Sequence, residues 1–567
     1  MSETEQTSEL FEFAAALVDK TAELSPIAAT HYGIESYDDR LDDFSIAHSE
    51  KTADLCRTSL RALRAIDARG DAERVGKAFI SERLTSQLSL HEAGEMRRTF
   101  SVSSSPAIEI RGVFELQPAE NSDHAEKFRA RLAGVREALR SWRAALDEDS
   151  ARGLVPARRH SVGVADQLEV FSRGAFAEVA RRAAESCGVD ADGSGLNAAG
   201  EDADEASGEI AQWLREVHAP RASDIDAVGL ERYSPWARYY NGAELDFDEI
   251  YEWGWEDLKR INARMWEIAA EIAPAAASLS EAAAVLDADE SRAIHGTDAL
   301  LERLKSLTEG AVEMLDGTHF DIDPTIRFCD ARLAPEGAAA AAYYIPPSED
   351  LTTRPGTTWY PTLGHERFPI WRDVSTWYHE SVPGHHLQCA TAILESARLT
   401  RFQRLGFISG YGEGWALYAE RLMDELGAFA DPADEMGHLS GQALRAARIV
   451  VDIGMHLGKK APADIGVLGD LGDVAGRVWD AEMAVEMLVQ RAIEMRDKSE
   501  SEVDRYLGIP AQAISYKVGE RVWLRCREDA RRRLGGGFDL KAWHSYALRL
   551  GALGLDPFEA EMAAFSG

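Results

Sequence analysis

Apolar residues recur at helical spacing through most of the 567-residue chain, and this pattern limits the fold more than any other feature of the sequence. Residues 9–24, 48–66 and 125–146 place apolar side chains at i, i+3, i+4 and i+7, with charged side chains between them. The strict alternation that is typical of strands is scarce. The sequence therefore predicts a mainly α protein built around a large helical body.

Three stretches interrupt the helical pattern. Residues 105–117 (SPAIEIRGVFELQ) are the one strand candidate in the first part of the chain. Residues 188–207 are rich in Gly, Ala and Asp, which favours an exposed acidic loop. Residues 324–361 combine β-branched and aromatic residues with prolines and glycines, so we expect a few short strands there. A small β element beside the following histidine motif would suit substrate binding by strand addition.

The acidic insert also matches the register of a calcium-binding loop. Positions 1, 3, 5, 6 and 12 of the EF-hand pattern are occupied by Asp190, Asp192, Ser194, Gly195 and Glu201. However, Asn197 stands at the position where an apolar residue normally pairs two hands, and a second hand is missing from the sequence. We therefore favour a solvated acidic loop over a calcium site.

Charge and cysteine content restrict the partners and the compartment. The net charge is -35, from 97 acidic and 62 basic residues, and such a surface repels nucleic acid and anionic lipid. The chain lacks a run of about 18 apolar residues and a recognisable signal peptide at its start. Five scattered cysteines without a C-x-x-C pair fit a reducing cytoplasm. We expect a cytoplasmic protein whose oligomeric state the sequence leaves open.

Two helical regions are expected within one continuous body. Residues 1–230 form an N-terminal helical region that carries the acidic insert, and residues 231–567 form a second helical region. The second region contains the stretch Tyr378–His386 (YHESVPGHH), in which three histidines and a glutamate fall within eight residues. Such a cluster is rare by chance and predicts a metal site.

Hydrolysis assisted by zinc needs three protein ligands, an open position for water and a carboxylate that takes the proton of that water. Two histidines four apart on a helix can share a metal, but Pro383 stands four residues after His379. Because proline breaks the helix there, a bulge ending at Gly384 can bring His385 to the missing position. We favour His385 as the second ligand and keep His386 as the fallback.

Glu413 is the candidate for the third ligand. It opens an amphipathic helix (EGWALYAERLMDELG), and the two glycines that flank it predict a close approach of backbones. A glutamate in a first helical turn also has a purely structural explanation, since it complements the helix dipole. Glu420 lies seven residues on, on the same face, where it can support a ligand histidine.

These motifs resemble those of a known family. The segment 379–388 (HESVPGHHLQ) looks like the H-E-x-x-P-G-H-x-x-Q signature of a large bacterial family, domain of unknown function eight-eighty-five, which is considered similar to gluzincin zinc metallopeptidases. The segment 411–421 (YGEGWALYAER) resembles the next block of that family and the third-ligand block of zinc aminopeptidases. The resemblance implies a gluzincin-like helical fold, one Zn²⁺ ion, Glu413 as a ligand and Glu380 as general base.

Two later segments resemble further blocks of this family, namely 444–456 and 510–528, although the residues after His456 depart from it. By analogy with related peptidases, Tyr516 and His456 are candidates for donors to an oxyanion. Arg448 is a candidate for binding a substrate carboxylate. Structural alternatives remain open, since Arg448 can pair with Asp452 on one helix and Tyr516 can be a core aromatic residue.

The sequence therefore predicts a zinc-dependent metallopeptidase that cleaves peptides or oligopeptides, with water activated by the metal and Glu380 as general base. One alternative keeps the site but assigns it a non-peptide amide, which makes the protein a metal-dependent amidase. The other alternative is a non-catalytic helical binding protein.

Overall fold

The computed structural model describes residues 8–334, 341–349, 351–352 and 354–567, and it confirms a mainly α protein with a small β element. The chain divides into two compact units. Unit 1 comprises Met1–Ala68, Arg83–Pro235 and Asp504–Pro510, and unit 2 comprises Arg69–Glu82, Trp236–Val503 and Ala511–Gly567. One division point, at Pro235, lies close to the predicted boundary after residue 230. The expectation of one continuous body stays a prediction.

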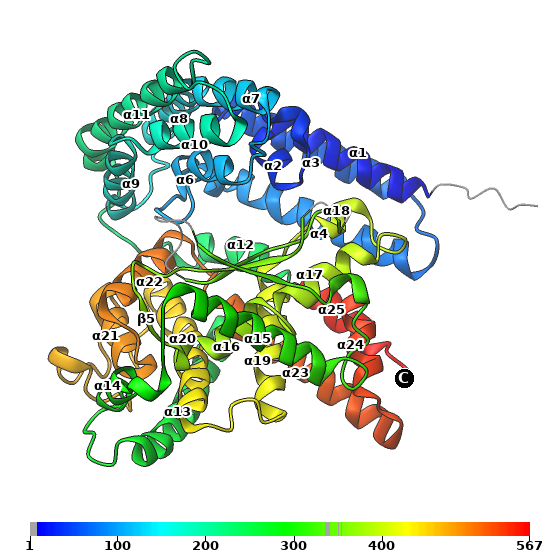
Figure 1. Cartoon of the computed structure of the whole chain (residues 1–567), viewed down its shortest axis with the longest axis vertical. Coiled ribbons are helices and arrows are strands. Elements are labelled where there is room, and N and C mark those ends of the chain that lie inside the picture. The colour runs from blue at the N-terminus through cyan, green and yellow to red at the C-terminus, as the bar shows by residue number, and fades with distance from the viewer. Residues whose placement is uncertain (1–7, 335–340, 350, 353) are drawn as a thin grey trace, which may run out of the picture. The chain divides into compact units, whose positions relative to one another are not determined.

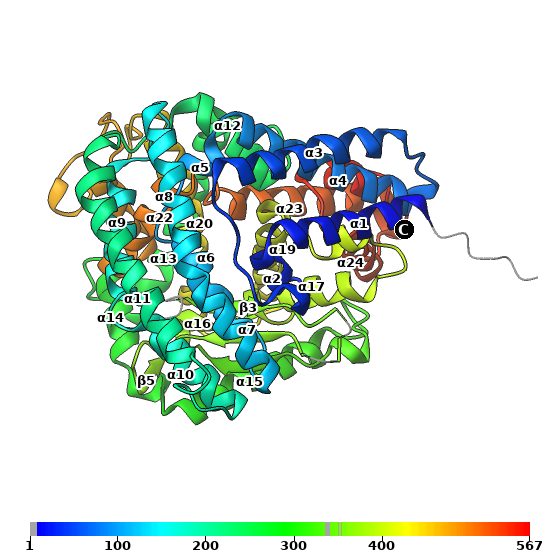
Figure 2. The same ribbon diagram turned by 90° about the horizontal axis from the view of Figure 1, so that it is seen from above.

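Helices build unit 1, and most are amphipathic with a buried apolar face. They are α1 (Glu9–Leu24), α2 (Pro26–His31), α3 (Ile46–Ala65), α5 (Glu95–Arg98), α6 (Pro106–Gly112), α7 (Ser122–Ala133), α8 (Val135–Ala151), α9 (Arg158–Phe171), α10 (Ala175–Cys187) and α11 (Leu196–Trp213). The division into units falls within α4 (Gly70–Glu92), α12 (Gly229–Asn241) and α22 (Arg496–Gly508). The central helix is α11, which packs against α7, α8, α9 and α10 (Figures 1 and 2).

The predicted loop at 188–207 is wrong, because residues 196–207 form the first two-thirds of α11. Small and apolar residues recur at helical spacing there, and Leu196, Ala203 and Ile210 are buried in the core of unit 1. Asp204, in the stretch that was predicted to be a solvated acidic loop, is buried. It accepts hydrogen bonds from the backbone N–H groups of Phe176 and Ala177 at 2.8 and 3.1 Å. It thus caps the start of α10.

The residues with calcium-loop register form a tight turn that leads into this helix. The Asp190 carboxylate accepts the backbone N–H of Gly193, and Asp192 accepts the side-chain amide of Asn197 at 2.6 Å. Glu201 lies within α11. The two aspartates therefore accept hydrogen bonds from their own segment. These contacts do not support a calcium site.

The strand predicted at 105–117 is also wrong. Ser105 is the N-cap of α6 and its side chain accepts the backbone N–H of Ile108, while Pro106 occupies the first helical turn. A capping serine followed by proline at this position is a signal for the start of a helix. The apolar residues of the segment, which include Ile110 and Val113, are buried against the core of unit 1.

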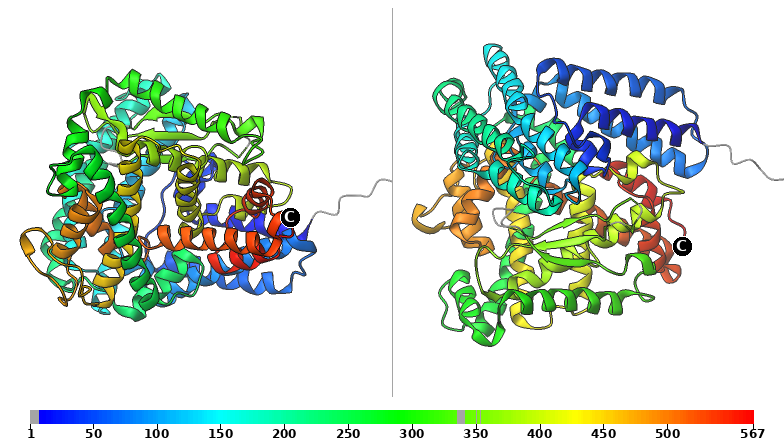
Figure 3. Two further views of the ribbon diagram at one scale, coloured as in Figure 1. Left: turned by 90° about the horizontal axis from the view of Figure 1, so that it is seen from below. Right: turned by 45° about the horizontal axis from the view of Figure 1, so that its top comes forward.

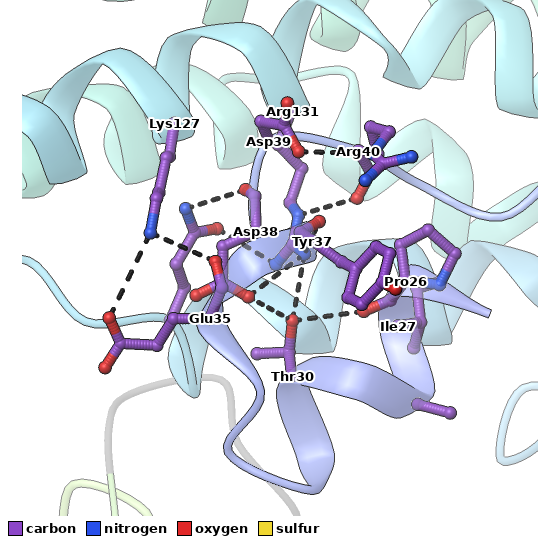
Figure 4. A network of polar contacts seen from close by, with 12 residues as sticks. Pro26, Ile27, Thr30, Glu35, Tyr37, Asp38, Asp39, Arg40, Lys127 and Arg131 are labelled. Carbon is purple, nitrogen blue, oxygen red and sulfur yellow. Dashed lines mark hydrogen bonds and ion pairs between the residues drawn. The ribbon is translucent and has the colours of Figure 1, made fainter. Parts of the chain in front are cut away.

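A buried polar network fastens the segment after α2 to α7 (Figure 4). Arg131 is fully buried and donates to the carbonyl of Arg40, to Gln117 and to the hydroxyl of Thr30, at 2.9–3.0 Å. Its guanidinium also lies 3.3 Å from the carboxylate of Asp38. Burial raises the pKa of Asp38, and the contacts with Thr30 and Arg131 oppose that rise. Removing either partner of this buried pair would leave the other charge buried without compensation and would destabilise the fold.

We expect Arg131→Met to lower the free energy of unfolding by about 3–5 kcal/mol, because it leaves the Asp38 carboxylate buried without its cation. Urea unfolding, followed by hydrogen exchange in α2 and α7, measures the change. As a matched control, Arg129→Met on the same helix removes an exposed pair with Glu126 and should cost no more than about 0.5 kcal/mol. Equal effects of the two substitutions would contradict the proposed role of the network.

Unit 2 is also helical, and its longest helices form its core. Its complete helices are α13 (Phe247–Ile272), α14 (Leu279–Ala288), α15 (Thr297–Leu315), α16 (Asp373–Glu380), α17 (His385–Leu394), α18 (Arg401–Arg404), α19 (Ser409–Glu425), α20 (Pro432–Leu457), α21 (Ala481–Ala492), α23 (Ser515–Leu534), α24 (Leu540–Arg549) and α25 (Leu555–Ala563). The helix α20 is buried along most of its length and packs on α13, α16 and α21 (Figure 3).

Two small sheets belong to unit 2. In the first, β4 (Thr357–Tyr360) lies between β2 (Asp330–Leu333), to which it is parallel, and β3 (Tyr343–Ile345), to which it is antiparallel. In the second, β1 (Ala293–His295) pairs antiparallel with β5 (Arg367–Pro369). The short strands predicted in 324–361 are confirmed, although residues 335–340, 350 and 353 of that stretch lie outside the described residues. Across the described chain, we find no helix with the length and apolar character that crossing a membrane requires.

Candidate metal centre

The helix is broken where the Pro383-Gly384 pair predicts a break. The helix α16 ends at Glu380 and α17 begins at His385. Between them the backbone bulges, and the N–H of Gly384 donates to the carbonyl of Tyr378 at 3.0 Å. The indole N–H of Trp415, on α19, donates to the carbonyls of Pro383 and Gly384 at 3.0 and 3.1 Å and holds the bulge. His379 and His385 thus approach each other from two helices.

The structure brings His379, His385 and Glu413 together. One nitrogen or oxygen from each lies within 4.8 Å of the others. The Nε2 atoms of His379 and His385 lie 3.2 and 3.5 Å from Oε2 of Glu413. Ligands at about 2.0–2.1 Å from a tetrahedral zinc ion are separated by about 3.3 Å, so these spacings fit such an ion.

A close crossing of helices positions Glu413. It is the fifth residue of α19, which begins at Ser409, four residues earlier than the sequence suggested. A Cβ atom at Gly414 would lie 2.5 Å from the Cα of Gly519 on α23, and one at Gly519 would lie 2.0 Å from the carbonyl oxygen of Gly410. Only glycines permit this approach of α19 and α23, which confirms the close contact that the flanking glycines predicted.

Glu420 orients one of the candidate ligands. Its carboxylate accepts Nδ1–H of His379 at 2.8 Å, so the Nε2 lone pair of that ring faces Glu413 and His385. Glu420 also accepts the hydroxyl of Ser375 at 2.6 Å, and Ser375 lies 2.9 Å from Nδ1 of His438. All of these side chains except Glu413 are buried. A carboxylate behind a ligand histidine is the usual arrangement in zinc sites.

Charge in the cluster is set by its carboxylates. Burial lowers the pKa of His379, but hydrogen bonds with Glu413 and Glu420 outweigh burial and raise the pKa to about 9. Burial would raise the pKa of Glu413, but its hydrogen bonds with His379 and His385 hold that pKa far below the usual range. The cluster therefore favours positive charge, and a metal ion bound there would replace the proton on His379.

We expect Glu420→Gln to weaken zinc binding about 10–100-fold, because the amide keeps the size of the side chain but removes the charge that supports His379. Competition with a chromophoric chelator measures the affinity. The matched control is Asp424→Asn, one turn further along α19. Its nearest basic partner, Arg421, lies 3.9 Å away, so the substitution breaks no close ion pair. It should leave the zinc affinity unchanged. Equal affinities of the Glu420→Gln variant and the unaltered chain would argue against an outer partner at this position.

Glu380 ends α16 next to His379 and is only 9% exposed. Burial raises the pKa of its carboxyl group, and the nearby His379 and His385 oppose the rise. Within the described chain, the Glu380 carboxylate makes no hydrogen bond to a protein group. It is therefore available to a water molecule or a substrate beside the cluster, as a general base must be.

Tyr516 also lies beside the cluster, in the first turn of α23. Its ring stacks on that of His379, with 6.5 Å between centroids and 19° between planes. The guanidinium of Arg448 lies 4.6 Å from the centre of the Tyr516 ring. Tyr516 is half-buried.

Arg448 lies on α20 behind Tyr516. Its guanidinium is bound to the carboxylate of Glu502 at 2.8 Å and is only 8% exposed. Because an internal carboxylate and the Tyr516 ring contact this guanidinium, it supports the position of Tyr516, and its binding of a substrate carboxylate stays a prediction. The sequence placed Arg448 on the correct helix but could not show that α22 brings Glu502 to it.

His386, the fallback ligand, is excluded by its own contacts. Its Nε2–H donates to the carbonyl of Ile326 at 2.8 Å, and Nδ1 accepts the hydroxyl of Tyr344 at 3.0 Å. Burial lowers the pKa of the ring to about 4, so the ring is neutral. With both nitrogens engaged, His386 ties α17 to β3 and has no lone pair left for a metal.

His456 lies near the end of α20. It is 1% exposed, and its Nε2 lies 3.8 Å from the carboxylate of Asp452 one turn earlier on the same helix. Its role as a donor to an oxyanion stays a prediction.

Sequence reasoning missed two residues that the structure places at the centre. Arg445 lies beside Glu420, and the ring of Phe407 lies 6.3 Å from that of His385 while remaining 53% exposed. Arg445 belongs to the same family segment, 444–456, as Arg448, but only Arg448 was assigned a role from the sequence. Phe407 lies between α18 and α19, outside any helical pattern.

The helical fold and the His/His/Glu cluster define the chain as a mainly α protein with a candidate metal centre. It belongs to the family described as bacterial protein of unknown function (DUF885), whose model matches residues 26–562.

Two solved structures are similar to this fold. One is described as "the putative lipoprotein from Colwellia psychrerythraea", with a TM-score of 0.83, 20% identity and 98% of each chain covered. The other is described as "a putative lipoprotein of unknown function from Shewanella oneidensis", with a TM-score of 0.73 and 19% identity, covering 98% of this chain and 100% of that one. At such identities the likeness concerns the fold alone. A search among curated proteins gave no match.

Proposed function

We propose that the protein is a zinc-dependent metallopeptidase that cleaves peptides or oligopeptides, with a gluzincin-like centre of His379, His385 and Glu413. The observation that supports this most strongly is the geometry of the three ligand atoms: all lie within 4.8 Å of one another, and the two separations from Glu413, 3.2 and 3.5 Å, match those around tetrahedral zinc. The unengaged carboxylate of Glu380 beside them adds the group that hydrolysis needs.

Zinc, when bound, activates water and polarises a carbonyl group. Glu380 takes the proton of the attacking water and returns it to the nitrogen of the leaving amine. The amine therefore leaves as a neutral group and not as an anion. The Tyr516 hydroxyl donates to the oxygen of the carbonyl as negative charge develops there. The support of Arg448 and Glu502 behind the Tyr516 ring fixes its position beside His379.

A cytoplasmic location is part of the proposal. All five cysteines are free, which suits a reducing compartment. The lipoprotein descriptions belong to the two similar structures. Cell fractionation decides the location, and recovery of the protein with the membrane fraction would overturn it.

Metal analysis and a peptide digest test the proposed function. The purified chain should hold one zinc ion, and the zinc-loaded chain should cleave members of a peptide library that the chelator-treated chain leaves intact. A panel of non-peptide amides runs in parallel. Cleavage of amides alone would replace the peptidase by an amidase. Absence of stoichiometric zinc, together with a Glu380→Gln variant that is unchanged in every property, would favour a binding protein.

A further inference from the structure

Arg445 places a guanidinium against the acidic side of the cluster. It lies on α20, and its Nη2 is 3.9 Å from the carboxylate of Glu420. Glu380, Glu413 and Glu420 make the surroundings strongly negative. Any anionic part of a substrate needs a positive group here to overcome that repulsion.

The guanidinium of Arg445 has unused donors. Its side chain is 12% exposed, and its Nε is buried without a hydrogen-bond partner. Within the described residues, 3.9 Å to Glu420 is its nearest approach to a carboxylate, which is too long for a hydrogen bond. Arg448, three residues further along the helix, has its Nη2 at 2.8 Å from Glu502. Arg445 is thus the arginine with a free fork for a planar anion.

A glycine makes room for this side chain. A Cβ atom at Gly441, one turn earlier on α20, would lie 2.6 Å from Nη1 of Arg445. The guanidinium therefore lies back along the helix, toward Glu420 and the ligand histidine. Glu420 lies between the two, 3.9 Å from Arg445 and 2.8 Å from Nδ1 of His379, the ring nitrogen turned away from Glu413. With the imidazole ring and a metal–nitrogen bond of about 2.1 Å added, the guanidinium lies at most about 11 Å from the proposed metal position. An extended chain covers at most about 3.3–3.6 Å per residue, so about three residues span this distance.

We infer that Arg445 binds the C-terminal carboxylate of the substrate, so that the centre acts on peptides that end within about three residues of the cleaved bond. This inference rests on the proposed function, which it deepens by naming the substrate class. The substrates are short peptides with a free carboxylate, or the last residues of longer ones. Arg445 binds this carboxylate by two parallel hydrogen bonds.

Peptide binding to the full-length, zinc-loaded Glu380→Gln chain tests the inference without cleavage. The probes for calorimetry are Ala-Ala-Ala with a free carboxylate, the same peptide with a C-terminal amide, and Ala-Ala-Glu amide, whose only carboxylate is in a side chain. The free acid should bind about 10–100-fold more tightly than its amide, as expected for a hydrogen-bonded charge pair. Adding Arg445→Met should abolish the difference.

Arg421→Met is the matched control, because Arg421 also makes only long approaches, 3.7 Å to Glu520 and 3.9 Å to Asp424, but none to the cluster. It should keep the preference for the free acid. Arg445→Lys, which keeps the charge without the fork, should show an intermediate preference and guards against a folding defect of Arg445→Met.

Several results would overturn the inference. They are equal binding of acid and amide, a preference that survives Arg445→Met, absence of binding by either trialanine probe, and tighter binding of Ala-Ala-Glu amide than of the free acid. The proposed function is judged separately, by hydrolysis in the unaltered chain. Acid-selective binding without hydrolysis would support Arg445 as a carboxylate site and contradict the peptidase function. Hydrolysis without acid selectivity would support the peptidase function and contradict the role of Arg445.

Discussion

Glu380→Gln should lower the rate of peptide hydrolysis about 10²–10⁴-fold, the range that a general acid–base residue contributes. Glutamine keeps the length and polarity of the side chain but cannot accept and return a proton. Because Glu380 is not among the three ligand residues, the variant should bind zinc as the unaltered chain does. The measurement is kcat with a peptide that the unaltered chain cleaves, together with zinc content.

The pairing of these two readouts makes the test sharp. A loss of rate that accompanies a loss of zinc would show only that the centre had collapsed. Retained zinc with a rate reduced less than about 10-fold would exclude Glu380 as general base and would transfer the role to another group. Asp424→Asn, remote from the cluster on α19, should retain both zinc and rate and so controls for a general effect of removing an acidic residue.

Much of the centre could be predicted because its determinants are local. Pro383 cannot continue the hydrogen bonds of a helix, so the break between Glu380 and His385 follows from two residues in the sequence. Helical periodicity likewise predicted the class of fold. Glu413 lies on a different helix; its flanking glycines made it the candidate for the third ligand, and the family resemblance supports that choice.

The errors arose where tertiary packing decides. Residues 196–207 have the composition of a loop, but the alanine face of α11 is buried against four helices and stabilises a helix there. The contact between Arg448 and Glu502 likewise joins two helices that are far apart in the sequence, so the sequence could not predict it.

Gly384→Ala should be the most damaging single-atom change in the chain. A Cβ atom at residue 384 would lie 1.8 Å from the carbonyl oxygen of His379 and 2.5 Å from that of Tyr378. Both are backbone atoms of α16 and cannot rotate away, so the bulge must open. His385, the next residue, then moves relative to His379. We expect zinc binding to be lost and the free energy of unfolding to fall by about 1–3 kcal/mol or more.

Gly310→Ala is the matched control, since a Cβ atom there, within α15, would meet no atom within 4 Å. It should raise the free energy of unfolding by about 0.5–1 kcal/mol and leave zinc binding intact. Titration with zinc and thermal unfolding compare the two variants. If Gly384→Ala bound zinc as tightly as the control, the two ligand histidines would not depend on the bulge. The break at Pro383-Gly384 would then be a feature of the fold alone, and the assignment of His385 as the residue that replaces the i+4 histidine would fail.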